Sequence, residues 1–119
     1  MAMTPLNVPI RIVFYREEGR CIAHCLEFDL LGDGTNKREA AKSLGEAIAI
    51  QVEQTVRSGN VKNLINPAPQ EYWQKYALGR NLTDGDLRFV TTYDDALEIP
   101  SEDFREFADS DSDSELVPA

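Results

Sequence analysis

Two cysteines and the only histidine of the chain lie close together, as Cys21, His24 and Cys25. Cysteine and histidine are common zinc ligands, so this spacing calls for a test of a metal site. The segment has the composition of a β-strand, in which successive side chains point to opposite faces. Cys21 and Cys25 would then lie about 13 Å apart, with His24 on the other face. That separation is too large for a shared metal ion or a disulfide bond, so we expect ordinary strand cysteines, no metal site and no cofactor.

Three carboxylates follow the cysteines, at Glu27, Asp29 and Asp33. Clustered carboxylates can hold two divalent ions about 4 Å apart, as metal-dependent nucleases require. Glu27 and Asp29 share strand parity, so they could lie on one face of a sheet. Acidic residues are nevertheless mostly solvated, and the sequence places no nucleophile beside His24. We therefore predict no catalytic residue and no enzyme activity.

Aromatic side chains recur at Tyr72, Trp73 and Tyr76, with helical spacing after a pair of prolines. Such a cluster commonly packs on a core or on a dimer interface, and aromatic anchors also mark interfaces with other proteins. Base stacking on single-stranded RNA is an alternative, but the basic groove that accompanies it is missing from the sequence around these residues.

The elements that must position these residues begin with strands. Residues 10–15 are rich in β-branched and aromatic side chains and predict a strand. Residues 16–20 predict a hairpin loop, and residues 21–26 predict the returning strand. Phe28, Leu30 and Leu31 indicate a third short strand, which Gly32, Asp33 and Gly34 would end.

A long helix is the clearest predicted element. Asn36 can cap it, and Glu39 three residues later completes a capping box. Apolar residues then recur at helical spacing, at Ala41, Leu44, Ile48, Val52 and Val56. Gly59 lies where a helix ends, so the helix has about 20 residues and a length of about 30 Å.

The later part of the chain has weaker signals. Leu64 and Ile65 predict an edge strand, and residues 70–78 predict a short helix that Gly79 stops. Residues 87–93 alternate as a strand does, and residues 101–108 predict one or two helical turns. Residues 109–119 are of low complexity and predict disorder.

Together these elements predict an α+β fold, with a three- to four-stranded antiparallel sheet packed on one long helix and an acidic C-terminal extension. We expect a domain over residues 8–66, an extension over 67–108 and a disordered acidic tail over 109–119. An exposed sheet edge in so small a unit favours a homodimer or a higher homo-oligomer.

The charge is unevenly distributed along the 119 residues. Residues 1–69 hold 8 Lys+Arg and 8 Asp+Glu, whereas residues 70–119 hold 4 and 13, which gives the whole net charge of −9. A surface of this sign repels duplex DNA and attracts basic partners. No apolar run approaches the roughly 20 residues that span a membrane, and residues 1–9 lack the pattern of a signal peptide. We therefore expect a cytoplasmic protein.

Residues 10–55 resemble the N-terminal domain of HicB-family antitoxins. The similarity rests on residues 19–29, on the Gly32–Asp33–Gly34 turn, and on the Glu-Ala pairs at Glu39 and Glu46. It extends more loosely through Tyr72 and Trp73, which look like those of a stand-alone subgroup. The resemblance implies a partial RNase H-like fold of ββαβ outline, without nuclease activity. Members that repress their own operon carry a C-terminal DNA-binding unit, whereas residues 79–119 of this chain have no basic recognition helix.

The resemblance also implies a function. HicB proteins bind HicA, a small basic endoribonuclease toxin that cuts mRNA, so the chain is expected to bind and neutralise such a toxin. The residues expected to contact the toxin are Glu27, Asp29, Asp33, Tyr72 and Trp73. Two other functions stay open, a stand-alone RNA-binding or regulatory module without a toxin and a metal-dependent RNase H-like nuclease.

Overall fold

Five strands form the main sheet of the computed structural model, which describes residues 6–82, 92–94, 97–99 and 102–107. The strand order is β4, β3, β2, β8 and β5. In that order the strands are Leu30–Gly34, Arg20–Cys25, Ile10–Glu17, Glu102–Glu106 and Arg80–Leu82. A second, three-stranded sheet contains β1 (Leu6–Asn7), β7 (Leu97–Glu98) and β6 (Thr92–Asp94). The α+β class predicted from the sequence is confirmed.

The hairpin at the centre of the main sheet has the predicted position. Strands β2 and β3 pair antiparallel, with Glu17 opposite Arg20. The two residues between them, Glu18 and Gly19, have φ of 52° and 79°. Two successive positive φ values give a tight turn whose twist matches that of the two strands. A four-residue turn at residues 26–29 then leads into β4, which pairs antiparallel with β3.

Strand β8 makes the sheet mixed and corrects two predictions. It pairs parallel with β2, and Ile12 lies opposite Phe104. The prediction of an entirely antiparallel sheet of three to four strands is therefore wrong, as is the prediction of helical turns over residues 101–108. Glu102 and Glu106 are buried beside Phe104, so acidic residues occupy inward positions where a strand pattern would show apolar ones.

Helix α1 (Lys37–Arg57) begins at the predicted cap and ends beside Gly59, whose φ is 76°. The Asn36 side chain accepts a hydrogen bond from the Glu39 N–H at 2.9 Å. The second half of the predicted capping box is wrong, because the Glu39 carboxylate accepts hydrogen bonds from the N–H and the hydroxyl of Thr35. Satisfying these amide groups fixes where the helix starts.

Two glycines of β4 allow α1 to pack directly against this strand. A Cβ atom added at Gly32 would lie 2.1 Å from the backbone nitrogen of Leu44, and one at Gly34 would lie 2.4 Å from Glu39 Cβ. The third strand ends at Gly34, but the prediction that it already ends at Gly32 is wrong, since Gly32 lies within β4. The two glycines allow close approach of helix and strand rather than a turn.

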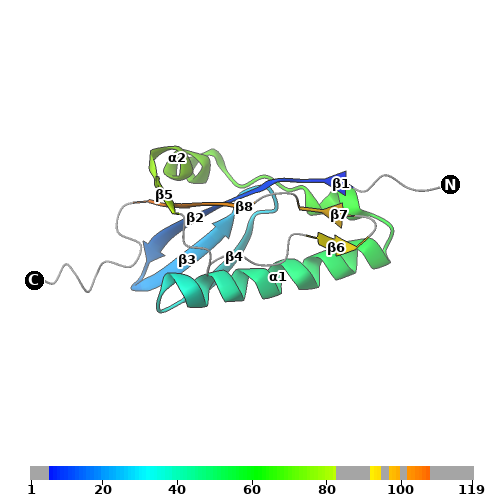
Figure 1. Ribbon diagram of the computed structural model, residues 1–119, viewed down its shortest axis with the longest axis horizontal. Helices are drawn as coiled ribbons and strands as arrows, with labels where there is room; N and C mark the ends of the chain where they lie inside the picture. Colours follow the sequence, from blue (N-terminus) through cyan, green and yellow to red (C-terminus); the bar gives the residue numbers. More distant parts are fainter. Residues whose placement is uncertain (1–5, 83–91, 95–96, 100–101, 108–119) are drawn as a thin grey trace, which may run out of the picture.

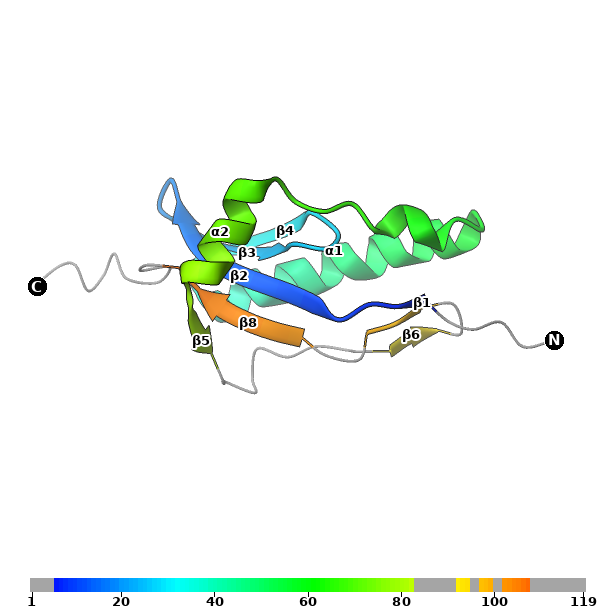
Figure 2. The same cartoon turned by 90° about the horizontal axis from the view of Figure 1, so that it is seen from above.

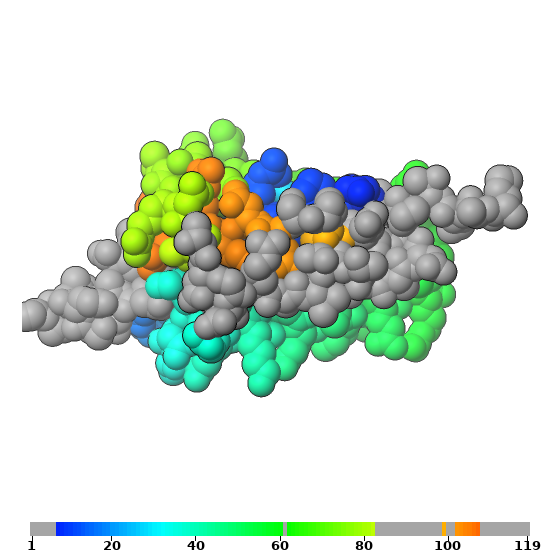
Figure 3. All heavy atoms as spheres, viewed as in Figure 1, coloured from blue at the N-terminus to red at the C-terminus, as the bar shows by residue number. Residues whose placement is uncertain are grey.

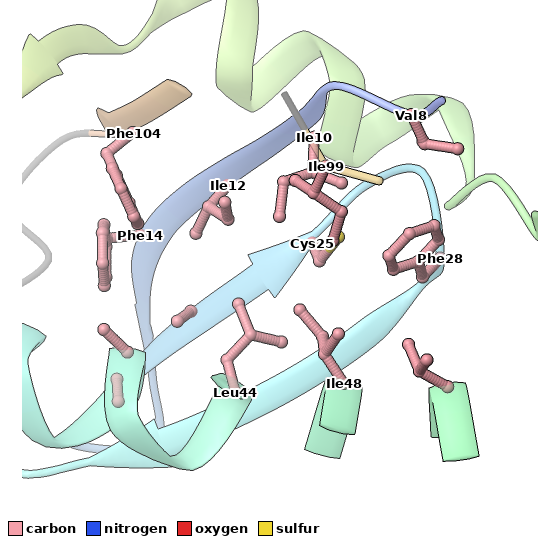
Figure 4. Packing of buried hydrophobic residues seen from close by; sticks show 14 of the residues in the cluster. Val8, Ile10, Ile12, Phe14, Cys25, Phe28, Leu44, Ile48, Ile99 and Phe104 are labelled. Atoms are coloured by element: carbon pink, nitrogen blue, oxygen red, sulfur yellow. The ribbon is translucent and has the colours of Figure 1, made fainter. Parts of the chain in front are cut away.

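The main core fills the space between α1 and the sheet. Leu44 and Ile48 point from α1 toward Ile12, Cys25 and Phe28 (Figure 4). Strand β8 extends this core through Phe104, whose ring centroid lies 6.0 Å from that of Phe14. Each fully buried large aliphatic side chain contributes about 1.5–3 kcal/mol, so α1 is held chiefly by this contact.

Helix α2 (Gln70–Leu78) lies on the opposite side of the sheet from α1 (Figures 1 and 2). In the space-filling view the two helices form opposite margins of the molecule, with part of β8 visible between them (Figure 3). Helix α2 has the predicted bounds and ends at Gly79. It packs on a second apolar cluster, whose buried members are Val13, Tyr15, Leu26, Ala68 and Tyr76.

The connection between the helices differs from its prediction. Leu64 lies in a 3₁₀ helix, η1 (Val61–Leu64), and not in an edge strand. The buried side chain of Leu64 holds the 3₁₀ helix in place. The sequence around Leu64 fits a short strand as well as a 3₁₀ helix, so it does not distinguish the two. Strand β6 covers the end of the strand predicted for residues 87–93, while residues 87–91 and 109–119 lie outside the described residues.

Candidate functional site

Helix α2 covers only part of its face of the sheet. Tyr76 and Ala68 are buried over β2 and His24 of β3 is buried as well, whereas the part around Ile22 of β3 and Leu31 of β4 is more open. Ile22 is half-buried there, and the side chain of Leu31 is 49% exposed. Leu31 lies opposite His24 in the strand pairing, and Ile22 lies opposite Asp33. We call this open part of the face, together with Tyr72 at its border, the β3–β4 surface.

A buried polar network lies at the edge of the β3–β4 surface. The Tyr15 hydroxyl lies 2.9 Å from His24 Nδ1, and Asp29 Oδ1 lies 2.7 Å from His24 Nε2. A carboxylate can only accept, so Nε2 carries the hydrogen and Nδ1 accepts from the tyrosine. This assignment satisfies both ring nitrogens of a histidine whose side chain is only 2% exposed.

The network holds a turn residue with a positive φ in place. Asp29 has φ of 54°, in the left-handed region that aspartate adopts more readily than most residues other than glycine. Its hydrogen bond to His24 connects the turn at residues 26–29 with the end of β3. A contact within the buried network thereby stabilises the turn.

Burial sets the charge state of this network. It lowers the pKa of His24, against the opposing effect of the Asp29 carboxylate. Burial also raises the pKa of Tyr15, and electrostatic repulsion from Tyr72, when ionised, and from Glu17 adds to the shift. At neutral pH both rings are therefore uncharged. The Tyr15 hydroxyl then donates to His24 Nδ1, and His24 Nε2 donates to Asp29.

Tyr72 covers the network from α2. Its ring centroid lies 4.5 Å from that of His24 and 5.7 Å from that of Tyr15. Partial burial raises the pKa of Tyr72, followed by the negative charges of Glu71 and Glu17. The carboxylates that act on the pKa of this tyrosine come from α2, from β2 and from the turn after β3, namely Glu71, Glu17 and Asp29.

A second group of contacts joins Glu27 to Trp73. Glu27 accepts hydrogen bonds from the Arg11 N–H at 2.7 Å and from its guanidinium at 2.5 Å. The same guanidinium lies 5.7 Å from the centroid of the Trp73 ring, and the Trp73 N–H donates to the carbonyl of Ala68. Burial raises the pKa of Glu27, although the hydrogen bonds from Arg11 oppose this shift.

The five residues expected to contact a partner fall into three groups. Asp29 and Tyr72 meet beside His24, while Glu27 and Trp73 both contact Arg11. Asp33 lies apart from them and pairs with Arg20 at 3.0 Å. The expectation that Glu27 and Asp29 share a strand face is wrong, because β3 ends at Cys25 and both lie in the following turn.

Two apolar members of the surface, Ile22 and Leu31, were absent from the predicted partner contacts. The alternation of β3 already places Ile22 on the face of His24, so the sequence held that signal. The sequence could not show that the side chain of Leu31 is exposed, because its exposure depends on how much of the sheet α2 covers. The sequence did not indicate a role for Tyr15, because its hydroxyl comes within hydrogen-bond distance of His24 only when β2 and β3 pair.

The cysteines face the other side. Cys21 and Cys25 are fully buried in the core under α1, so the prediction that they lie opposite His24 is confirmed. Burial raises the pKa of the Cys25 thiol to about 12. Among the residues that the structure describes, no three His, Cys, Asp or Glu side chains lie together as metal ligands do.

Within the described ranges, no helix combines the length and apolar character needed to cross a bilayer. Comparison with protein-family models, with curated proteins and with solved structures found no match.

Proposed function

We propose that the protein is a non-catalytic antitoxin, which neutralises a small basic HicA-type endoribonuclease by binding it at the β3–β4 surface. The observation that carries this proposal is the open part of the sheet face. It combines the exposed side chain of Leu31 with Ile22, Tyr72 and a border of carboxylates. The proposal also rests on the resemblance of residues 10–55 to HicB-family antitoxins.

The surface has the chemistry of an interface with a basic protein. An apolar centre excludes water and provides most of the affinity, while a charged border acts mainly on the association rate. Screened surface ion pairs contribute only about 0–1 kcal/mol each, so the carboxylates alone would not hold a toxin. Leu31, Ile22 and Tyr72 supply the apolar contact that inhibition requires.

The polar network supports binding rather than catalysis. His24 is 2% exposed, and both of its ring nitrogens already have hydrogen-bond partners in Tyr15 and Asp29. A general base must reach the proton that it abstracts, and His24 is enclosed by these side chains. Its role in the proposal is to fix Tyr72 and the turn at Asp29 in the orientation that a partner meets.

Co-expression with a basic HicA-type protein from the same genome tests the proposal. We expect the pair to co-purify and the antitoxin to restore growth. Leu31→Lys places a charge in the apolar centre and should abolish both effects. Leu78→Lys is the matched control, since Leu78 is 77% exposed at the end of α2 and its substitution should change neither.

Kinetics separate the two parts of the surface. Tyr72→Ala should mainly speed dissociation, whereas Glu17→Lys should mainly slow association and reduce its dependence on salt. If the pair neither co-purifies nor restores growth, the antitoxin function is wrong for this chain. Retention of RNA in place of a protein would then favour the stand-alone RNA-binding module.

A further inference from the structure

Strand β4 forms one edge of the main sheet, and β5 lies at the other end of the strand order. In the described part of the chain, β3 is the only strand that pairs with β4. An edge strand directs the N–H and C=O groups of alternate residues away from the sheet, where another chain can pair with them. Proteins usually protect such edges with charged side chains, proline or a bulge. The sequence of β4 is Leu-Leu-Gly-Asp-Gly, and it pairs with β3 in unbroken register, so Asp33 is its one protecting residue.

Exposed apolar side chains occur on β4 and on the helix that packs against it. Leu31 lies on the face that α2 partly covers, and Ile50 of α1 is 58% exposed. Residues 43, 47, 50 and 54 of α1 form an uncharged stripe of Ser, Ala, Ile and Gln at helical spacing. At 100° per residue, this stripe lies on the side of α1 shared by Glu39 and Ala40, which contact Gly34 of β4.

A second copy of the chain fits this edge poorly. Paired strands lie about 4.8 Å apart, whereas packed helices need about 8–10 Å between their axes. Helix α1 packs directly on β4, since a Cβ atom added at Gly32 would lie only 2.1 Å from Leu44 N. Pairing of β4 with itself about a two-fold axis would therefore bring the two α1 helices too close. An extended segment without a helix above it has no such obstacle.

Charge selects the kind of segment. Asp29 and Asp33 lie just before β4 and within it, with side chains 32% and 54% exposed. Arg20 pairs with Asp33 and offsets part of this charge. On the other face, the segment would meet the uncharged stripe that includes Ile50. A strand alternates its side chains between faces, so the fitting sequence alternates basic with apolar residues.

We propose that β4 and the uncharged stripe of α1 form a docking groove, which takes an extended, alternately basic and apolar segment of a partner protein as an added strand. This inference rests on the proposed function in one respect, since it names how the toxin would dock beside the β3–β4 surface. The backbone of the segment would bond to the β4 edge. Its apolar side chains would contact Ile50, and its basic side chains would contact Asp29 and Asp33.

A peptide tests the groove directly. The probe is Lys-Val-Lys-Val-Lys-Val-Lys with blocked ends, added to the full-length protein while amide signals are followed by NMR. We expect shifts and slower hydrogen exchange in residues 30–34. The same peptide N-methylated along its backbone should bind at least about tenfold more weakly, because it cannot form the strand hydrogen bonds. Ile50→Lys should weaken the unmodified peptide similarly, and Leu78→Lys should not.

Other results would overturn the proposal. Equal binding of the N-methylated peptide, or shifts confined to α2, would show charge attraction without strand addition. A dimer in sedimentation that Ile50→Lys dissociates would show that a second copy occupies the edge. If the toxin binds and Ile50→Lys leaves its affinity unchanged, strand addition is wrong while the antitoxin function stands. If the peptide binds at β4 but no toxin does, the groove stands and the antitoxin function fails.

Discussion

Gly32→Ala tests how closely α1 is seated on β4. The added Cβ atom would meet the backbone of Leu44 at 2.1 Å and the carbonyl oxygen of Ala40 at 2.5 Å. Carbon atoms rest about 3.5–4 Å from non-bonded neighbours, so helix and strand must separate by more than 1 Å. No side-chain rotation relieves this contact, because both neighbouring atoms belong to the backbone.

The expected loss of stability follows from this displacement. Overpacking a core usually costs about 1–3 kcal/mol, and a rigid backbone contact belongs at the upper end. Replacing glycine by alanine in a strand returns about 0.5–1 kcal/mol, which leaves a net loss of about 2–2.5 kcal/mol. In thermal unfolding this corresponds to a decrease in Tm of about 10 °C.

A second glycine provides the matched control for this prediction. Gly19→Ala makes the same chemical change where no atom lies within 4 Å, but at a φ of 79°. Its cost is backbone strain alone, about 1–2 kcal/mol. Urea unfolding of both variants should therefore show the larger loss for Gly32→Ala. An equal or smaller loss would refute the close seating of α1 on β4, and with it the argument against self-pairing of that edge.

The other predictions concern the polar network, the thiols and the charge. Burial lowers the pKa of His24, so the unfolded chain takes up the proton first and stability should fall as pH drops below about 6.5. His24→Gln, which can keep both hydrogen bonds, should lose less stability between pH 7 and pH 5.5 in urea unfolding; an equal loss would exclude His24 as the cause. Cys21 and Cys25 should resist iodoacetamide in the folded protein and react after unfolding, as mass spectrometry would show. No complex with duplex DNA should form below micromolar concentration at physiological salt, and a gel shift checks this.

Local patterns in the sequence were enough to predict the helices and the hairpin. Helix α1 combines an asparagine cap, a repeated apolar spacing and a terminal glycine, and each of these acts within a few residues. Strands β2 and β3 follow from β-branched composition and a short polar turn. Helix α2 follows from the preceding prolines and from Gly79. The tertiary contacts of these elements favour the same helix and strand conformations as their local sequences, so local patterns were sufficient.

Strand β8 could not be predicted in this way. Its inward positions include Glu102 and Glu106, which the hydrophobic pattern assigns to solvent. Glu106 is buried because Lys37 lies 3.0 Å from one carboxylate oxygen and Arg80 lies 2.5 Å from the other. Both partners are distant in the sequence, so nothing near residue 106 indicates that the charge is compensated. The same holds for the parallel pairing with β2, which joins residues about 90 positions apart.

The site was predicted in part for a related reason. The sequence placed His24 opposite the cysteines, as the structure has it, whereas contact of a partner with Glu27, Asp29, Asp33, Tyr72 and Trp73 stays a prediction. It did not show that Asp29 turns back onto His24, since that contact depends on a positive φ in the turn. It also did not show that Arg11 neutralises Glu27, because this pair spans the strand pairing of β2 with the end of β3.

The two faces of the sheet are built by opposite means, and this difference determines where a partner can bind. On the α1 face, apolar packing and Gly32 bring the helix down onto the edge strand, which leaves no open sheet surface over β4. On the α2 face, the Tyr15–His24–Asp29 network occupies the boundary between covered and open surface. The Tyr15 hydroxyl and both ring nitrogens of His24 have partners within the network, so a partner protein that docks there need not desolvate them. The partner meets Leu31 and Tyr72 instead, at a surface whose position the buried network holds fixed.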